Sequence, residues 1–461
     1  MKLFFKLIFL TSILSVWVNA SLINTAFVDK DIKILEELDI KSSYITDYKL
    51  QKELQKRLKL NKNRYTEKLN NAYLFIPKIK KILKENEIPS AFLYLVMAES
   101  NFKLSASSNK SAKGLWQFIP NTAKHYGLET NKYIDERMDI VKSTEAAVKY
   151  LKRLHGLFDK WFIAAIAYNC GEGRVIEGIT RASIDMYCED VGYKECRKDK
   201  KILDFRRVIR QYQKKQVRYS RLDRVYKEVK KWGYKPDIEQ LLVFQKGLKR
   251  QYLPKESRNY IRKIISLAFM NNSDFLIKDE NTHLLNRGIS DPIASVEVSG
   301  GVTLLKVSEV IGLEKNKLKK LNLHIKQNVI PTSEKMYTLY IPYSKLTRFN
   351  RYKSNLKAVP FEEYIVKNGD SLGKIANKFE IDYKSIKSYN NLKSNTIRVS
   401  QKLLIPVNPK LYQRSLDYIV KTGDTLGRIA SNHKIKVDKL MKDNNLKTSM
   451  IRVGDKLVIK N

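Results

Sequence analysis

The chain has 461 residues, of which 43% are apolar, and this length and composition suffice for two or more hydrophobic cores. They exclude a mainly disordered protein. The 88 Lys and Arg residues outnumber the 48 Asp and Glu residues, so the formal net charge is +40, which favours an anionic partner.

The first 20 residues have the parts of a secretory signal. Lys2 and Lys6 precede an apolar stretch over residues 7–18, and a small-x-small cleavage pattern ends at Ala20. The apolar stretch is shorter than the roughly 20 residues of a spanning helix, so we expect removal after Ala20 and not a retained anchor. Position 21 is not Cys, so a lipid anchor there is not expected. We expect an exported protein of the periplasm or cell envelope.

Export argues against nucleic acid as the partner of this basic chain, although clustered Lys and Arg neutralise phosphates. The charge is uneven, since residues 194–263 hold 24 Lys and Arg but only 8 Asp and Glu. An anionic wall polymer or a membrane surface suits such a region as a peripheral contact. A general bias of the composition toward Lys, Ile and Asn is the alternative explanation.

Helical periodicity dominates the first half of the chain. Residues 21–69 are polar and Lys-rich, and we expect a helical or poorly ordered lead-in. Residues 70–275 carry apolar side chains at spacings of three and four, as in "FIPKIKKILKEN", "EAAVKYLKRLHGLF" and "YIRKIISLAFM". This pattern predicts an all-α domain.

One acid in this domain has an unusual position. Glu99 follows the apolar residues 93–98 and precedes a loop rich in Ser and Asn. Desolvation at the end of an apolar helix favours the neutral carboxyl and raises its pKa, which suits a general acid near neutral pH. A solvated acid that caps a helix or pairs with Lys is the alternative.

Three cysteines are present. Cys188 and Cys196 flank a short polar segment, and in an oxidising compartment we expect them to form a disulfide. Cys170 is expected to remain a free thiol that packs as a small buried side chain.

Two copies of one sequence module follow, starting at Tyr364 and Tyr418, and they align without a gap at a period of 54 residues. Each opens and closes with a short alternating strand, and apolar residues at helical spacing lie between the strands. The predicted order is strand, helix, helix, strand, over residues 361–407 and 415–461.

This module resembles LysM along its whole length, with the "GDSL" or "GDTL" opening and the later "NNL" segment intact. The resemblance implies binding of glycans that contain N-acetylglucosamine, in a shallow groove between the first turn and the second helix-strand loop. The implied glycan-binding residues are Asp370, Ser371, Asn390, Asn391, Asp424, Thr425, Asn444 and Asn445. Helix capping alone is the alternative role for these polar side chains.

A weaker third copy lies within residues 290–345. It has the helical pattern and an Asn at position 322, but it lacks the Asp after its Gly pair. We expect a degenerate LysM-like spacer without ligand contacts.

Four motifs of the helical domain stand in the order and approximate spacing of a known family: "AESNF" at 98–102, "AKGLWQFIPNTA" at 112–123, "AIAYNCGEGRV" at 165–175 and "LPKESRNYIRKI" at 253–264. They resemble the lytic transglycosylases of the membrane-bound D type, which combine a lysozyme-like SLT domain with C-terminal LysM modules. The expected fold is therefore α+β and multidomain, with an all-α lysozyme-like catalytic domain followed by small βααβ modules.

The resemblance also implies roles for single residues. Glu99 is the catalytic acid, Tyr168 orients it, and Gln117 offers its amide to the sugar. The implied substrate-binding residues are Ser100, Gln117, Tyr168, Asn169, Glu256 and Tyr260. A packing role is expected instead for Phe102, Trp116, Phe118 and Trp161.

The implied reaction cleaves the bond between N-acetylmuramic acid (MurNAc) and N-acetylglucosamine (GlcNAc) in peptidoglycan. Most glycosidases need two carboxylates, but no second acid lies in the Glu99 loop. In the family's reaction Glu99 protonates the glycosidic oxygen and then deprotonates the muramyl C6 hydroxyl, which closes a 1,6-anhydro ring. A hydrolytic muramidase on the same fold and a non-catalytic glycan-binding scaffold are the alternatives.

Residues 176–250 are longer and more basic than the family pattern, and we expect them to form either a solvated helix pair or a site for a partner or for the anionic wall peptides. The five His residues are scattered, with no pair at i and i+4 and no Asp-rich calcium loop, so we expect no metal and no cofactor.

Overall fold

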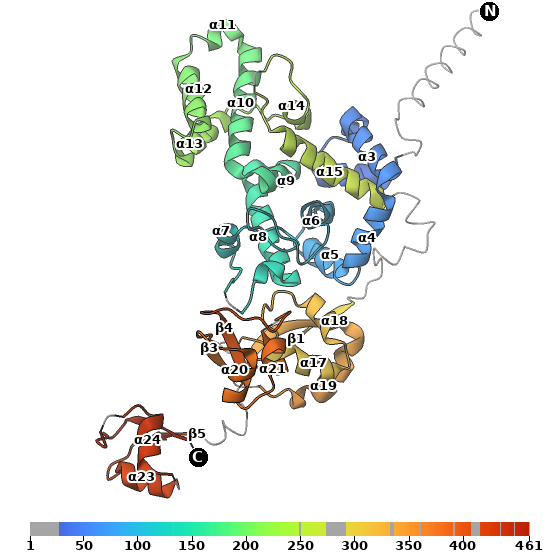
Figure 1. Ribbon diagram of the computed structural model, residues 1–461. Coiled ribbons are helices and arrows are strands. Elements are labelled where there is room, and N and C mark those ends of the chain that lie inside the picture. Colours follow the sequence, from blue (N-terminus) through green and yellow to red (C-terminus); the bar gives the residue numbers. More distant parts are fainter. Residues whose placement is uncertain are drawn as a thin grey trace, which may run out of the picture. The chain divides into compact units, whose positions relative to one another are not determined.

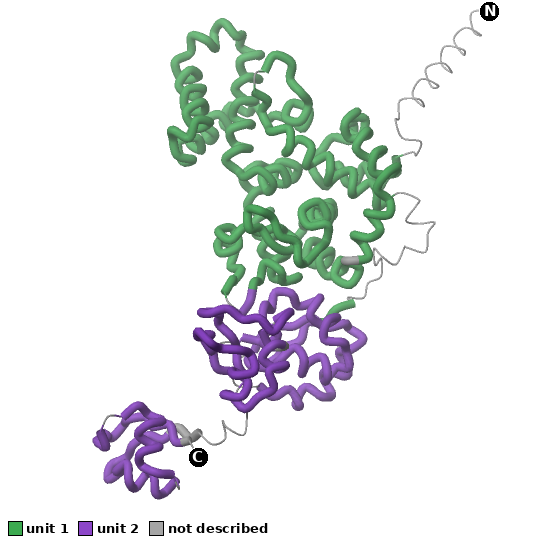
Figure 2. The backbone as a smooth tube through the Cα atoms, viewed as in Figure 1, with its two compact units in different colours: residues 1–131, 135–294 green, residues 132–134, 295–461 purple. Residues whose placement is uncertain are grey.

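The computed structural model describes residues 27–131, 133–248, 250–272, 292–331, 336–358, 361–390, 392–406, 415–433, 435–446 and 448–460. The proposed signal at residues 1–20 and Asn391 lie outside these residues. The chain forms two compact units, residues 1–131 with 135–294 (unit 1) and residues 132–134 with 295–461 (unit 2) (Figure 2). In the described ranges, no helix has the length and apolar character needed to cross a membrane.

Helices make up nearly all the regular secondary structure in the described residues of unit 1 (Figure 1). Its α-helices are α2 (Asp29–Glu37), α3 (Tyr48–Leu60), α4 (Lys62–Ala72), α5 (Ile76–Glu85), α6 (Phe92–Ser100), α7 (Pro120–His125), α8 (Ile140–Phe158), α9 (Trp161–Cys170), α10 (Glu172–Val191), α11 (Tyr193–Cys196), α12 (Lys200–Gln213), α13 (Tyr219–Lys230), α14 (Ile238–Leu242) and α15 (Lys255–Asn271). Two 3-10 helices are η1 (Ser42–Thr46) and η2 (Glu136–Met138).

The centre of unit 1 is α6, which is apolar on every side. Its residues 92–98 are all buried, and the helix packs against α5 and α15. A helix that is hydrophobic all round belongs in the interior of a domain. The core therefore forms around the helix that carries Glu99 near its C-terminal end.

The lead-in is part of this domain, because α3 packs along α15. Asp47 caps α3 by accepting from the Leu50 N–H at 2.7 Å, and it also pairs with the buried Arg262 of α15, with 3.1 Å between Oδ1 and Nε. The Nε of Arg57 donates to the Ser266 hydroxyl at 2.9 Å. These bonds tie α3 to α15 and so fix one wall of the region around Glu99.

The basic segment after α9 folds as helices that pack on one another. α10 and α12 both pack against α13, and Cys188 of α10 forms a disulfide with Cys196, with 5.6 Å between their Cα atoms. Phe205 stacks on Trp232 with 5.9 Å between ring centroids. Cys170 is a free, half-buried cysteine.

The described residues of unit 2 contain three strand pairs, in which β1 pairs with β2, β3 with β4 and β5 with β6. Its elements are β1 (Ile293–Ser299), α17 (Leu304–Ile311), α18 (Lys315–Leu321), β2 (Met336–Pro342), η4 (Tyr343–Lys345), α19 (Leu346–Tyr352), η5 (Lys353–Asn355), β3 (Phe361–Ile365), α20 (Leu372–Lys378), α21 (Tyr383–Tyr389), β4 (Lys402–Pro406), β5 (Ser415–Ile419), α23 (Leu426–Asn432), α24 (Val437–Asp443) and β6 (Lys456–Lys460). Each pair encloses two helices in the order strand, helix, helix, strand, as predicted for the two repeats.

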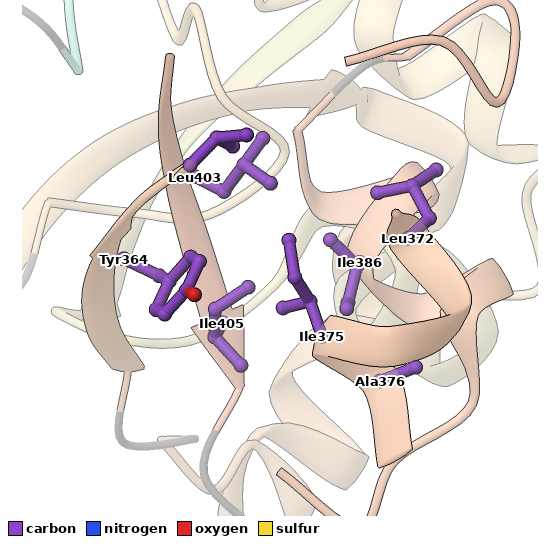
Figure 3. Close-up of a cluster of buried hydrophobic side chains, with 8 residues drawn as sticks. Tyr364, Leu372, Ile375, Ala376, Ile386, Leu403 and Ile405 are labelled. Atoms are coloured by element: carbon purple, nitrogen blue, oxygen red, sulfur yellow. The ribbon is translucent and has the colours of Figure 1, made fainter. Parts of the chain in front are cut away.

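Each repeat has its own small core. In the first repeat, side chains from both helices and both strands meet between the sheet and the helices (Figure 3); they include Leu372, Ile375, Ala376, Ile386, Leu403 and Ile405. The residues 54 positions later form the matching core of the second repeat. The sheets are antiparallel, with Tyr364 opposite Leu403 and Tyr418 opposite Leu457.

Candidate active site

Glu99 lies near the C-terminal end of α6 and is half-buried. The helix stops immediately afterwards because Asn101 adopts a left-handed conformation, with φ 52°, and its N–H bonds to the Met97 carbonyl at 3.0 Å. Asn tolerates this conformation better than most residues. The sharp end leaves the Glu99 carboxyl at the border between an apolar core and a loop.

Two side chains of α15 form hydrogen bonds with the C-terminal end of α6. The buried Tyr260 donates its hydroxyl to Oε1 of Glu99, and the Lys263 ammonium donates to the carbonyl of Ala98 at 2.6 Å. Positions three apart share one face of a helix, so both side chains point from α15 toward α6. A tyrosine and a cation therefore contact the last turn of α6.

The pKa of the Glu99 carboxyl lies above its ordinary value. Burial raises it, the hydrogen bond from Tyr260 and the charge of Lys263 oppose this, and the negative charge of Glu256 adds to the rise. Burial outweighs the opposing effects of Tyr260 and Lys263, because a carboxylate in an apolar setting loses its hydration. The group has the protonation preference of a general acid.

Tyr168 does not make the hydrogen bond that we expected. Its hydroxyl donates to the Trp116 carbonyl at 2.6 Å, and Tyr260 occupies the orienting position on Glu99 instead. Burial and the nearby Glu99 charge raise the pKa of Tyr168 well above its ordinary value. Its ring packs against Tyr150, with 5.2 Å between centroids. Tyr168 therefore braces the Trp116 loop and stays close to Glu99.

That loop places Gln117 in a left-handed conformation, with φ 49°. Its amide nitrogen donates to the Gly114 carbonyl at 2.8 Å and to the Ala106 carbonyl at 3.3 Å. Gly114 has φ 79°, and a Cβ there would lie 1.7 Å from the Arg137 carbonyl oxygen. Only glycine fits this close approach. The Gln117 amide, predicted to meet sugar, thus also closes its own loop.

A buried ion pair stabilises the loop that carries Gln117. Arg137 contacts Asp135 through two hydrogen bonds of 2.8 Å, and its Nη1 donates to the Ser111 carbonyl at 2.8 Å. Both side chains are at most 5% exposed. A bidentate pair of this kind fixes direction as well as distance. No sequence pattern reveals the role of this pair, because the Ser111 carbonyl that it holds is 26 residues away along the chain.

The remaining predicted residues separate into buried and exposed groups. Ser100 is buried and donates to the Val96 carbonyl at 3.0 Å, so it stabilises α6 and has no exposed surface for sugar. Asn169 accepts from the Ser257 hydroxyl at 3.4 Å, and Glu256 is exposed. The residues expected to pack do so in three cases, since Phe102, Trp116 and Phe118 are buried. Trp161 is half-buried and stacks on His155.

A cavity of about 960 Å³ lies beside this constellation. Its lining includes Asn169, Glu256 and Tyr260, three of the residues predicted from the motifs, together with Lys263. One face of α3 also contributes, which sequence analysis did not anticipate. Among the described residues, no group of His, Cys, Asp and Glu side chains is arranged to hold a metal ion.

In the repeats, the Gly-Asp turn is held by its acid. Asp370 accepts from the Tyr364 hydroxyl at 2.9 Å and from the Lys367 N–H at 2.7 Å, and Asp424 does the same with Tyr418 and Lys421. The bonds from the Lys367 and Lys421 N–H groups are the largest causes that lower the pKa of the two acids. The next residue in each copy caps the following helix; the pairs are Ser371 with the Lys374 N–H and Thr425 with the Arg428 N–H.

The Asn residues of the repeats act as clamps between the second helix and the closing strand. The Asn390 amide donates to the Ile386 and Leu404 carbonyls at 2.8 Å, and its oxygen accepts from the Leu404 N–H at 2.7 Å. Asn444 repeats this pattern at Leu440 and Val458. Both amides therefore fix the loop that borders the predicted groove.

The spacer has the same clamp. Asn322 donates to the Leu318 and Tyr340 carbonyls and accepts from the Tyr340 N–H, at 2.8–2.9 Å, and Thr303 caps α17. The spacer thus keeps the framework of the repeats although it lacks the Asp of their turn. Asn445, the last predicted glycan contact, is exposed and has φ 54°.

Comparison with known families agrees with this architecture. The transglycosylase SLT domain matches residues 77–185, and the LysM domain matches residues 364–406 and 418–460. A third family, the LysM-like domain of lytic transglycosylase MltD, matches residues 293–358, which cover residues 293–345 of the spacer.

Individual relatives agree as well. The chain is 26% identical over 397 residues to the membrane-bound lytic murein transglycosylase D of Escherichia coli (strain K12), which covers 82% of this chain and 74% of that protein. It is 39% identical over 101 residues to the N-acetylmuramoyl-L-alanine amidase sle1 of Staphylococcus saprophyticus, covering 21% of this chain and 31% of that protein. It is 34% identical over 99 residues to the cell wall-binding protein YocH of Bacillus subtilis, covering 22% and 34%.

The SLT domain binds and acts on peptidoglycan and the LysM domains bind its glycan strands. The chain contains, in this order, an SLT domain, an MltD LysM-like domain and two LysM domains. It is also similar to the Escherichia coli enzyme over most of its length. These domains and this similarity indicate a lytic transglycosylase that acts on peptidoglycan and resembles the membrane-bound murein transglycosylase D type.

Proposed function

We propose that this enzyme cleaves the β-1,4 bond between MurNAc and GlcNAc with Glu99 as its single acid and base. The protonated carboxyl gives its proton to the glycosidic oxygen as the bond to the muramyl C1 breaks. The resulting carboxylate then takes the proton of the muramyl C6 hydroxyl, whose oxygen attacks C1 and closes the 1,6-anhydro ring. The observation that carries the proposal is a half-buried acid that accepts a hydrogen bond from a tyrosine and whose pKa is raised by burial.

Tyr260 has a clear part in this cycle. Its hydroxyl donates to Oε1 of Glu99, so it stabilises the carboxylate that forms after the first proton transfer. Tyr168 and Gln117 shape the loop beside the acid, and Asn169 and Glu256 line the adjoining cavity. We assign these four residues to the shape of the substrate site.

A hydrolytic muramidase is the second candidate, and one observation favours it. Glu256 lines the cavity beside Glu99 and its charge contributes to the raised Glu99 pKa, which makes it the candidate for a second carboxylate. A hydrolase needs such a group to activate water. The two reactions leave different ends on the glycan.

The products of purified sacculi test the proposal. Mass spectrometry of the released fragments should find muramyl ends that are lighter by one water than reducing ends. Reducing muramyl ends would support the muramidase, and an absence of released fragments would support a binding scaffold.

We propose that the enzyme meets this substrate in the cell envelope after export. The support is the signal-like pattern of residues 1–20 together with a substrate that lies outside the cytoplasm.

The pH dependence of cleavage should respond to two neighbours of Glu99 in opposite directions. Glu256→Gln removes a negative charge that raises the Glu99 pKa, so the alkaline limb of kcat/KM should move to lower pH. Tyr260→Phe removes a hydrogen bond that lowers this pKa, so the limb should move to higher pH. Rates on soluble glycan fragments across pH check both shifts, and a limb that moves in neither variant would show that Glu99 does not control it.

The LysM repeats should act together on a long polymer. Because the two sites are tethered, removing residues 408–461 should weaken sedimentation with insoluble peptidoglycan by about a hundredfold in apparent affinity. Removing residues 361–461 should weaken it further and leave cleavage of short soluble glycans largely intact. Undiminished sedimentation of the shorter chain would remove the repeats from the binding role.

In each repeat we propose a glycan groove between the Gly-Asp turn and the loop after the second helix. Asp370 with Ser371 and Asp424 with Thr425 hold the turn, while Asn390 and Asn444 hold the loop. Asn391 and Asn445 follow the clamps and complete the proposed groove.

A further inference from the structure

The cavity beside Glu99 has a strongly basic lining. Seven of its lining side chains are Lys or Arg, and two are Glu. Its volume of about 960 Å³ is at the upper end of the range for small-molecule sites, so it has room for more than one sugar hydroxyl or acetyl group. The lining comes chiefly from α3 and from the first half of α15.

Three of the four α15 cations that line the cavity are engaged within the protein, and the fourth, Lys255, is exposed. Arg262 pairs with Asp47, Arg258 donates to the Leu242 carbonyl at 3.5 Å, and Lys263 donates to the Ala98 carbonyl. They form the floor of the cavity and hold α3, α14 and α6 around α15. Their charge is partly satisfied by these contacts.

The α3 lysines, Lys49, Lys52 and Lys56, are different. They are exposed and spaced by three and four residues, so they lie on one face of α3, while Leu50 and Leu54 are buried on the other. Within the described part of the chain none of the three makes an ion pair. Lys52 lies 5.8 Å from the centre of the Tyr48 ring.

The acid on this wall does not neutralise the α3 lysines. Glu53 pairs with Arg57, which is itself tied to Ser266 of α15. Three cations thus remain side by side over a cavity whose floor is already positive. Like charges held this close repel one another, and an anion between them relieves the repulsion.

The cavity adjoins the proposed reacting centre. Tyr260 lines it and bonds to Glu99, and Lys263 lines it and bonds to the residue before Glu99. When a glycan is bound at Glu99, a group near the cleaved bond therefore lies within reach of the α3 lysines. GlcNAc carries no charge, and the lactyl group of MurNAc is neutral where a peptide is attached to it. The anionic part of the polymer is the peptide stem with its free carboxylates.

We propose that the α3 lysines bind the carboxylates of the peptide stem on a muramyl residue next to the cleaved bond, so that the enzyme prefers stem-bearing glycan to bare glycan. The inference rests on the proposed function, because it places the cleaved glycan in this cavity. It assigns the lead-in helix a role in substrate selection.

The test compares two substrates: soluble glycan strands with their peptide stems, and the same strands after an amidase has removed the stems. The wild-type protein should show a higher kcat/KM on stem-bearing strands, and added salt should reduce this preference. Changing Lys49, Lys52 and Lys56 together to Gln should lower the ratio of the two kcat/KM values about tenfold, since exposed pairs contribute modestly and three act together. Changing all three to Arg should keep the preference.

A matched control removes the same charge elsewhere in unit 1. Lys194, Lys200 and Lys214 are exposed and do not line the cavity, so changing them to Gln should leave the ratio at the wild-type value. Thermal unfolding of each variant checks that the fold is kept.

An unchanged ratio of the two kcat/KM values in the α3 Gln variant overturns the inference. If that variant also loses sedimentation with vesicles of anionic phospholipid, the α3 lysines are instead assigned to a membrane surface. Failure of the proposed function looks different, since no protein would then release 1,6-anhydro ends from either substrate.

Discussion

Glu99→Gln should lower the rate of peptidoglycan cleavage by at least about a hundredfold, because a positioned proton donor typically contributes that much or more. The amide keeps the shape of the side chain but neither gives a proton to the glycosidic oxygen nor accepts one from the C6 hydroxyl. Release of soluble fragments from sacculi measures the loss. Sedimentation with the same sacculi should persist, since the LysM repeats remain.

Glu256→Gln is the matched control for this variant. It removes an acid that lines the same cavity, and under the transglycosylase account it should retain most of the activity apart from its shift in pH dependence. A Glu99→Gln protein that still cleaves at near the wild-type rate would show that another group is the acid. Loss of activity in both variants, with reducing ends in the wild-type products, would favour the muramidase.

Asp135→Ala should destabilise unit 1 by about 3–5 kcal/mol, because it leaves the buried Arg137 guanidinium without its carboxylate. The loop that carries Gln117 should loosen at the same time, since Arg137 also holds the Ser111 carbonyl. Urea unfolding of the variant measures the change in the free energy of unfolding. Lys113→Gln is the control and should cost far less, because Lys113 is 36% exposed and lies 3.3 Å from Asp135.

The same pair predicts how stability depends on pH. Burial raises the pKa of Asp135, but the hydrogen bonds and charge of Arg137 outweigh this, with help from Lys113, and the net pKa is below the ordinary value. A lowered folded-state pKa means that the stabilisation is complete above the ordinary carboxyl range and is lost as the pH falls through the folded value. Wild-type stability should therefore fall on acidification more steeply than that of Asp135→Ala. Parallel curves for the two proteins would contradict this role of the pair.

The sequence was most informative where the pattern is local or repeated. The 54-residue repeat predicted the order of strands and helices in both LysM copies, because alternation and helical spacing depend on neighbouring residues. The buried apolar segment before Glu99 could be predicted for the same reason. For residues 27–69 the sequence was compatible with either helices or poor order. Helices α2 and α3 of this segment are stabilised by contacts with α15, which no local pattern encodes.

The parts that sequence analysis missed depend on long-range contacts. Tyr260 and Glu99 are 161 residues apart, so nothing in either motif shows that Tyr260, and not Tyr168, bonds to the acid. The clamping role of Asn390 and Asn444 is hidden for a related reason, since a polar residue at a helix end suggests a cap or a ligand equally well. The three-residue spacing of Tyr260 and Lys263 could have indicated that both side chains lie on one face of α15 and contact the same neighbouring helix.

The source of the oxygen on the new muramyl ends tests the central claim most directly. Sacculi should be digested with the wild-type enzyme in heavy-oxygen water, and the released fragments should be analysed by mass spectrometry. If the C6 hydroxyl is the nucleophile, the muramyl ends are 1,6-anhydro and carry no label. Reducing muramyl ends that carry one heavy oxygen would show that water attacks C1, which contradicts Glu99 as the single acid and base.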